Sequence, residues 1–187
     1  MPASDPDVLR ELAAMHIRAG SPADLRQRDR ALAWLVEHAD RAWPTVLARA
    51  EDAPQDAVLI DVLGRLRRPE ATALLRRAFA SERTRGAAAA GLGMSPDPAA
   101  RAFLRETLTS SQPPDVVGAL AGLGASGDRT ACGDVMPQLQ SDNAEIRWTA
   151  VDAAMRLGCL DAATLDRIAR DDPDPDVRAR AGQPAAR

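Results

Sequence analysis

Apolar residues recur at every third or fourth position along most of the chain, which is the spacing of one face of an α-helix. Capping residues, proline and glycine interrupt this pattern at short intervals. The segments that it predicts to be helical are 5–19, 22–39, 42–51, 54–67, 69–80, 82–93, 97–109, 113–124, 129–140, 143–158, 161–171 and 175–182. The hydrophobic pattern therefore predicts an all-α protein built from short helices.

The ends of these segments carry residues that start or stop helices. Ser21, Asp97 and Asp174 each precede a proline, so a side-chain acceptor occupies the N-cap and the proline takes the first helical position. Leucine–glycine pairs end every second segment, and we expect their glycines to close the helices in a left-handed conformation. These glycines are Gly64, Gly93, Gly124 and Gly158.

One short phrase recurs along the chain. Residues 143–150 reappear 31 residues later as residues 174–181, with the aliphatic, arginine and alanine positions in step. Such a period is typical of a solenoid, because one helix pair cannot bury its apolar face without stacking on the next pair. We therefore predict a right-handed α-solenoid of about five to six antiparallel helix pairs.

The repeat is most complete between residues 135 and 158, where a helix, a short turn and a second helix follow each other. This stretch resembles a HEAT-like repeat of the short bacterial kind that also occurs in phycobilisome lyases. The resemblance implies a curved superhelix, with the first helix of each pair on the convex face and the second on the concave face. We expect a single domain over residues 1–187, with clear repeats at 54–182 and helical capping repeats at 1–53.

The composition narrows the classes of function. All 24 basic residues are arginine, which excludes chemistry that needs a lysine, such as Schiff-base formation. The net charge of −3 argues against a general nucleic-acid coat or a membrane-surface protein. The chain shows no signal-peptide pattern and no apolar run of the about 18 residues that a membrane span needs. We therefore predict a cytoplasmic protein without a membrane or nucleic-acid partner.

The cysteines and histidines do not suggest a metal site. Cys132 and Cys159 are interpreted as small buried or half-buried thiols rather than as a disulfide framework or zinc ligands. His16 and His38 end successive antiparallel helices and should lie on opposite rims, too far apart to share a metal ion. We predict no cofactor of any kind.

The helical segment 143–158 has two faces when its residues are placed at 100° intervals. One face is an apolar stripe that we assign to the core, and Trp148, Asp152 and Met155 lie on the opposite, concave face. The same offset in the two preceding second helices falls on very small residues, namely Gly86, Ala90, Gly118 and Gly122. The pattern therefore predicts a smooth trough that ends at a tryptophan.

Arginine residues form two further patterns. Arg85, Arg147 and Arg178 share one position of the repeat, and we expect them to bridge to acidic or carbonyl groups of the neighbouring repeat. Residues 65–85 contain seven arginines and two glutamates, whereas residues 161–176 contain six aspartates and two arginines. This asymmetry indicates either an interaction surface or a solvated surface that complements helix dipoles.

These observations support three hypotheses for the function. The leading one is a non-catalytic interaction module or scaffold that binds a protein partner along the concave groove, with Trp148 as the central contact. The second comes from the Trp148–Asp152 pair, which is similar to a pair in bacterial HEAT-like alkylpurine DNA glycosylases and implies that Asp152 stabilises a developing cation. The third is a regulatory subunit or a relative of tetrapyrrole lyases. Self-association through an exposed apolar edge of the C-terminal repeat is a further expectation.

Overall fold

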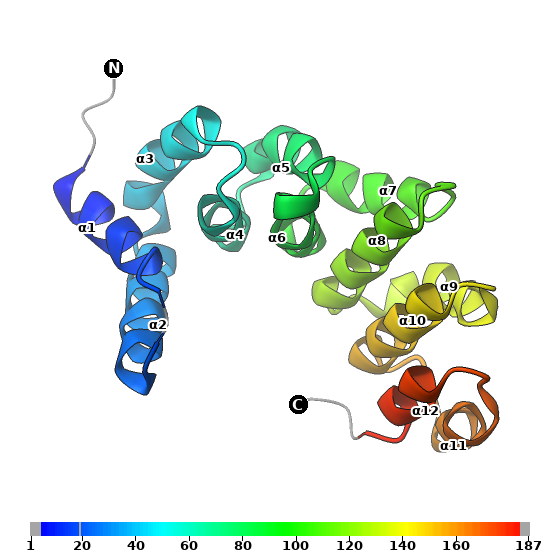
Figure 1. Cartoon of the computed structure of the whole chain (residues 1–187). Coiled ribbons are helices and arrows are strands. Elements are labelled where there is room, and N and C mark those ends of the chain that lie inside the picture. Colours follow the sequence, from blue (N-terminus) through cyan, green and yellow to red (C-terminus); the bar gives the residue numbers. More distant parts are fainter. Residues whose placement is uncertain (1–4, 19, 184–187) are drawn as a thin grey trace.

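The computed structural model describes residues 5–18 and 20–183, and every regular element in these ranges is a helix (Figure 1). The outer helices are α1 (Pro6–Met15), α3 (Ala39–Asp52), α5 (Thr72–Phe79), α7 (Pro98–Thr107), α9 (Cys132–Val135) and α11 (Ala162–Asp171). The inner helices are α2 (Pro22–Glu37), α4 (Ala57–Arg65), α6 (Glu82–Met94), α8 (Pro113–Ser126), α10 (Ala144–Leu157) and α12 (Pro175–Ala181). Short 3-10 helices precede α5 (η1, Pro69–Ala71) and flank α9 (η2, Arg129–Ala131; η3, Met136–Gln140).

The helices form an arch of antiparallel pairs (Figure 1). The first helix of each pair lies on the convex side of the arch and the second lies on the concave side (Figure 1). Most buried apolar residues belong to one cluster that extends from α1 to α10, and a smaller cluster joins α10 to α12. The structure therefore confirms the predicted all-α solenoid and the predicted order of outer and inner helices.

The predicted helix starts at the three proline sites are confirmed. The Ser21 hydroxyl accepts a hydrogen bond from the Asp24 backbone N–H at 3.2 Å. The carboxylates of Asp97 and Asp174 each accept one from the backbone N–H two residues later, at 2.9 Å. These bonds satisfy donors that the first turn of a helix leaves without a partner.

Other predicted boundaries were less accurate. Helix α3 begins at Ala39 rather than at residue 42 and contains Pro44, because the His38 carbonyl accepts the N–H groups of Arg41 and Ala42 and starts the helix earlier. The predicted helix 129–140 is divided into η2, α9 and η3. Pro137 at the start of η3 has no N–H to continue the α-helical hydrogen bonds of α9. The predicted end of the first segment, residue 19, lies outside the described residues.

The prediction that four leucine–glycine pairs close helices was wrong for three of them. Gly64, Gly93 and Gly124 lie inside helices, and only Gly158 has the expected left-handed conformation, with φ of 69°. Gly127, with φ of 65°, closes α8 in the same way. Gly127 and Gly158 are 31 residues apart and are thus equivalent C-caps. The prediction aligned Gly124, rather than Gly127, with Gly158. It therefore placed the C-cap of α8 three residues too early.

The glycines inside the helices allow successive inner helices to touch through their backbones. A Cβ atom at Gly64 would lie 2.5 Å from the Cα atom of Gly91, and one at Gly124 would lie 2.9 Å from the Cα atom of Ala153. A Cβ atom at Gly93 would overlap the carbonyl oxygen of α8 residue Gly122. These contacts join α4 to α6, α6 to α8 and α8 to α10, and no side chain fits between the helices at these points.

Helices α6 and α10 each pack through two opposite sides. Positions two apart on a helix differ by about 200°, so Gly91 packs against α4 while Gly93 packs against α8. On α10 the corresponding positions are Ala153, which packs against α8, and Met155, which clusters with Val177 of α12. Met155 is 8% exposed. Its predicted place on the concave surface was wrong, because α12 covers this part of α10.

Arginine–aspartate pairs join neighbouring repeats along the array. The Arg147 guanidinium donates to both Asp172 carboxylate oxygens at 2.9 and 3.0 Å and to the Ser141 carbonyl at 2.9 Å. Arg85 pairs with Asp115 of the next repeat at 3.4 Å. Further pairs between elements are Arg41–Asp5, Arg68–Asp40, Arg101–Asp128, Arg105–Asp134 and Arg180–Asp152. The predicted bridging role of Arg85 and Arg147 is confirmed, whereas Arg178 donates to the carbonyls of the loop before its own helix.

We expect Arg147→Ala to lower the free energy of unfolding by about 2–3 kcal/mol, because it leaves a largely buried carboxylate without its partner. The Arg147 and Asp172 side chains are 11% and 10% exposed. Arg156→Ala is the matched control, since its side chain is 55% exposed in an ion pair within α10, and we expect it to cost less than about 0.5 kcal/mol. Urea denaturation monitored by circular dichroism measures both values, and equal losses would contradict the assigned role.

The same pair also predicts the direction of a pH dependence. The hydrogen bond from Arg147 lowers the pKa of Asp172 below its ordinary value of 3.8, despite the opposing effect of burial. A carboxylate with a depressed pKa stabilises the folded state above its unfolded-state pKa. This contribution is lost as the pH falls below 3.8 and through the lower folded-state pKa.

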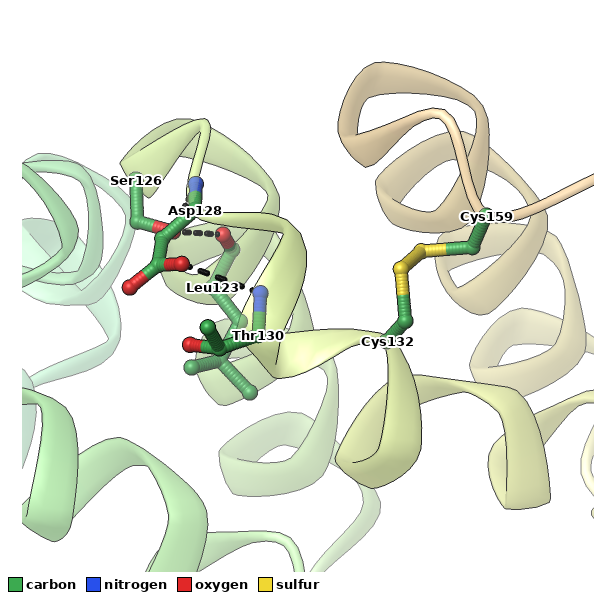
Figure 2. Close-up of a disulfide and its surroundings, with 6 residues drawn as sticks. All are labelled: Leu123, Ser126, Asp128, Thr130, Cys132 and Cys159. Carbon is green, nitrogen blue, oxygen red and sulfur yellow. Dashed lines mark hydrogen bonds between the residues drawn. A yellow bond between two sulfur atoms is a disulfide. The ribbon is translucent and has the colours of Figure 1, made fainter.

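Cys132 and Cys159 form a disulfide, so the prediction of two separate thiols was wrong (Figure 2). The bond joins the start of α9 to the turn after α10. The loop before α9 is held by the Ser126 hydroxyl, which accepts from the Asp128 N–H at 3.1 Å, and by the Asp128 carboxylate, which accepts from the Thr130 N–H at 2.9 Å (Figure 2). These bonds fix the backbone that leads to Cys132.

The position of the disulfide follows from the antiparallel helix pair. The start of the first helix and the end of the second lie at the same rim, and the two cysteine Cα atoms are 5.6 Å apart. The predicted segments 129–140 and 143–158 already place Cys132 near the start of one helix and Cys159 just after the end of the next, so this pairing could have been predicted from the sequence. Structural disulfides persist mainly in oxidising compartments and are rare in the cytosol, and the cytoplasmic location stays a prediction from the sequence.

Candidate functional site

Trp148 is an exposed tryptophan on one of the inner helices. It lies on α10, and the residue is 39% exposed. The residues at the same repeat position are Gly86 on α6, Val117 on α8 and Ala179 on α12, all of them smaller. Gly86 and Ala179 are exposed, and Ala90, one turn after Gly86, is half-buried. Trp148 therefore projects further than its counterparts in the other repeats.

Two of the residues predicted to line the trough lie elsewhere. Gly118 and Gly122 are buried, because a Cβ atom on Gly118 would contact the ring of Phe79 and one on Gly122 would contact the backbone of α6. Their neighbours Val117 and Ala121 are the true counterparts of the concave positions, 31 residues before Trp148 and Asp152. An error of one residue rotates a helical position by about 100°, which moved the prediction from the concave surface into the contact between helices.

The Asp152 carboxylate forms ion pairs with two arginines. Its Oδ1 atom accepts hydrogen bonds from Arg180 Nε and Nη2 at 3.0 and 2.7 Å, and its Oδ2 atom pairs with Arg156 Nε at 2.8 Å. Arg180 is 8% exposed, so its charge needs a nearby carboxylate. Asp152 therefore neutralises a buried guanidinium rather than offering a free acceptor to a ligand.

A pocket of about 470 Å³ opens between α10 and α12 beside Trp148. Its lining residues are Ala144, Glu145, Trp148, Asp174, Asp176, Ala179, Arg180 and Gln183. The small side chains of Ala144 and Ala179 leave space next to the indole. The members of this pocket other than Trp148 were not predicted as site residues, although the 31-residue register places Glu145 beside Asp176 and Trp148 beside Ala179.

A protein-family model for HEAT repeats matches residues 45–122 and 117–184. The two matches cover most of the chain and agree with the stacked helix pairs of the structure. The chain belongs to the HEAT-repeat family. HEAT repeats generally mediate protein–protein interactions or scaffolding. No curated protein matches the chain in sequence.

Most arginines of residues 65–85, the arginine-rich segment of the HEAT array, make contacts within the fold. Arg65 pairs with Asp61 at 3.1 Å, and the Arg67 guanidinium donates to the Met94 carbonyl at 3.2 Å. Arg76 lies 4.8 Å above the Phe103 ring, and Arg68 and Arg85 form the ion pairs between repeats described above. These contacts favour a structural role for residues 65–85 over a binding surface.

The histidines of the HEAT array take part in local contacts. The Nδ1 atom of His16 lies 2.8 Å from the Leu12 carbonyl oxygen, and its Nε2 atom lies 2.8 Å from an Asp56 carboxylate oxygen. Burial lowers the pKa of His16, but the Leu12 carbonyl and the Asp56 carboxylate outweigh it and raise the pKa above its ordinary value. His38 stacks on Trp34. Within residues 5–18 and 20–183, no cluster of histidine, cysteine and acidic side chains is arranged to hold a metal ion.

The described surface of the HEAT array carries few large apolar side chains. Those exposed among the described residues are Leu25 and Val36 on α2 and Trp148 on α10. None of these three residues lies on α11 or α12, and self-association through the C-terminal repeat stays a prediction. Every described helix is also too short or too polar to traverse a lipid bilayer.

Proposed function

We propose that this HEAT array binds a protein partner on its concave side, at the groove between α10 and α12, with Trp148 as the central contact. The observation that carries the proposal is an exposed indole beside a pocket with two alanines in its lining. This arrangement is preformed, because α10 and α12 are held by the core cluster around Met155 and by the Arg180–Asp152 pair.

The physical argument rests on the size of the tryptophan and on the small residues around it. A tryptophan buries on the order of 150–250 Å² when it is fully covered. Tryptophan is also enriched among the few residues that carry most of the binding energy of protein interfaces. Ala144 and Ala179 allow the backbone of a partner segment to approach the indole closely. The exposed residues Leu25 and Val36 lie on α2, in the first repeat, and do not line this pocket.

The geometry gives less support to a DNA glycosylase. In that hypothesis the Asp152 carboxylate faces a substrate, but here its Oδ1 atom accepts hydrogen bonds from Arg180 and its Oδ2 atom forms an ion pair with Arg156. The pocket beside Trp148 contains the carboxylates of Glu145, Asp174 and Asp176. Carboxylates in this position repel the phosphates that dominate DNA binding.

The test is a comparison of Trp148→Ala with Leu25→Ala in affinity purification followed by titration of the co-purified protein. We expect Trp148→Ala to weaken binding at least about 30-fold, which corresponds to the loss of about 2 kcal/mol at a central interface residue. Both side chains are exposed, so both variants should retain the helical circular dichroism spectrum. Leu25→Ala should bind like the wild type. A partner that binds Trp148→Ala as tightly as the wild type would overturn the proposal.

A further inference from the structure

The pocket beside Trp148 has a charge that specifies the chemistry of its occupant. Glu145, Asp174 and Asp176 contribute three carboxylates. The fourth charged lining residue, Arg180, is already paired with Asp152. The N-termini of α10 and α12 add about half a positive charge each, which offsets roughly one of the three carboxylates. The mouth of the pocket therefore remains negative.

The aromatic wall of the same pocket favours the same kind of ligand. The face of an indole attracts cations, and the planar guanidinium group is the cation that stacks on it most readily. A stacked guanidinium still presents its N–H groups at its edge, where carboxylates can accept them in pairs. Trp148 and Glu145 lie three residues apart on α10, and Asp176 lies on the facing helix.

We propose that this groove recognises an arginine side chain of the partner protein, which stacks on Trp148 and donates hydrogen bonds to the carboxylates of Glu145 and Asp176. The inference rests on the proposed function, since it names the chemistry of the partner at the same groove. Ala144 and Ala179 provide the space for the guanidinium beside the indole. A lysine fits less well, because its ammonium group is a compact, strongly hydrated charge that cannot stack.

The decisive probe is a short peptide that carries one arginine between leucine and glycine residues, compared with the same peptide carrying citrulline. Citrulline has nearly the same shape as arginine but no charge. Binding is followed by nuclear magnetic resonance through the Trp148 indole N–H signal, which is assigned by its loss in Trp148→Phe. We expect the arginine peptide to bind at least about tenfold more tightly than the citrulline peptide at low salt.

Variants of the carboxylates make the test specific. Glu145→Gln combined with Asp176→Asn should remove most of the preference for arginine, while Asp166→Asn, an exposed carboxylate on α11, should leave it unchanged. Equal binding of both peptides at Trp148 would overturn the arginine inference and leave the groove proposal standing. Absence of any shift with the arginine peptide would also overturn it, and the groove proposal would then be judged by the Trp148→Ala titration alone.

Discussion

Gly93→Ala is expected to lower the free energy of unfolding by about 3–4 kcal/mol, at the upper end of what overpacking costs. The added methyl group would overlap the Gly122 carbonyl oxygen. That atom belongs to the backbone of α8, so no side-chain rotation can relieve the overlap. The two helices must move apart, and the buried contacts on either side of Gly93 are lost with them.

Gly86→Ala is the matched control, because Gly86 lies in the same helix and a methyl group added there would meet no neighbouring atom within 4 Å. Alanine is a better helix former than glycine, so we expect this variant to gain about 0.5–1 kcal/mol. Urea denaturation followed by circular dichroism measures both changes. If Gly93→Ala were as stable as Gly86→Ala, α6 and α8 would not be in backbone contact.

Removal of the disulfide is the second large effect. We expect Cys132→Ser combined with Cys159→Ser to lower the free energy of unfolding by about 3.5 kcal/mol, from the loop entropy of a 27-residue separation. The bond ties the start of α9 to the turn that leads into α11, and the small core cluster of α10–α12 depends on that turn. The C-terminal repeat should therefore become the first part of the array to open.

A reducing agent provides the control for this prediction. Dithiothreitol should destabilise the wild type by about the same amount and should leave the double serine variant unchanged. Hydrogen exchange locates the effect, and we expect faster exchange in α11 and α12 than in α4 and α6. A wild type whose denaturation midpoint is unaffected by dithiothreitol would contradict the structural role of the bond.

The outline of the fold was predictable because helix signals are local. Capping residues such as Ser21 and Asp97 act within one turn of the chain, and their predicted helix starts are confirmed. The role of Gly64, Gly93 and Gly124 was not predictable from local signals. A glycine that ends a helix and a glycine that lets two helices touch look alike in sequence, and only the neighbouring repeat distinguishes them.

The candidate site was predictable only in part for the same reason. The exposure of Trp148 follows from the two faces of one helix. The burial of Gly118 required the register between repeats to be correct to one residue, and the burial of Met155 required knowledge of where α12 packs. The Arg180–Asp152 pair spans 28 residues. This pair forms because α12 stacks on α10, and the sequence of either helix alone does not predict it.

The most direct test of the concave groove is site-specific photo-cross-linking in living cells. Benzoylphenylalanine is placed at position 183, which lines the pocket and leaves Trp148 intact, and the exposed position 25 on α2 serves as a control site outside the pocket. We predict that position 183 cross-links to one discrete protein and that position 25 does not. Cross-linking of that protein from position 25 alone, or equally from both positions, would contradict binding at the groove between α10 and α12.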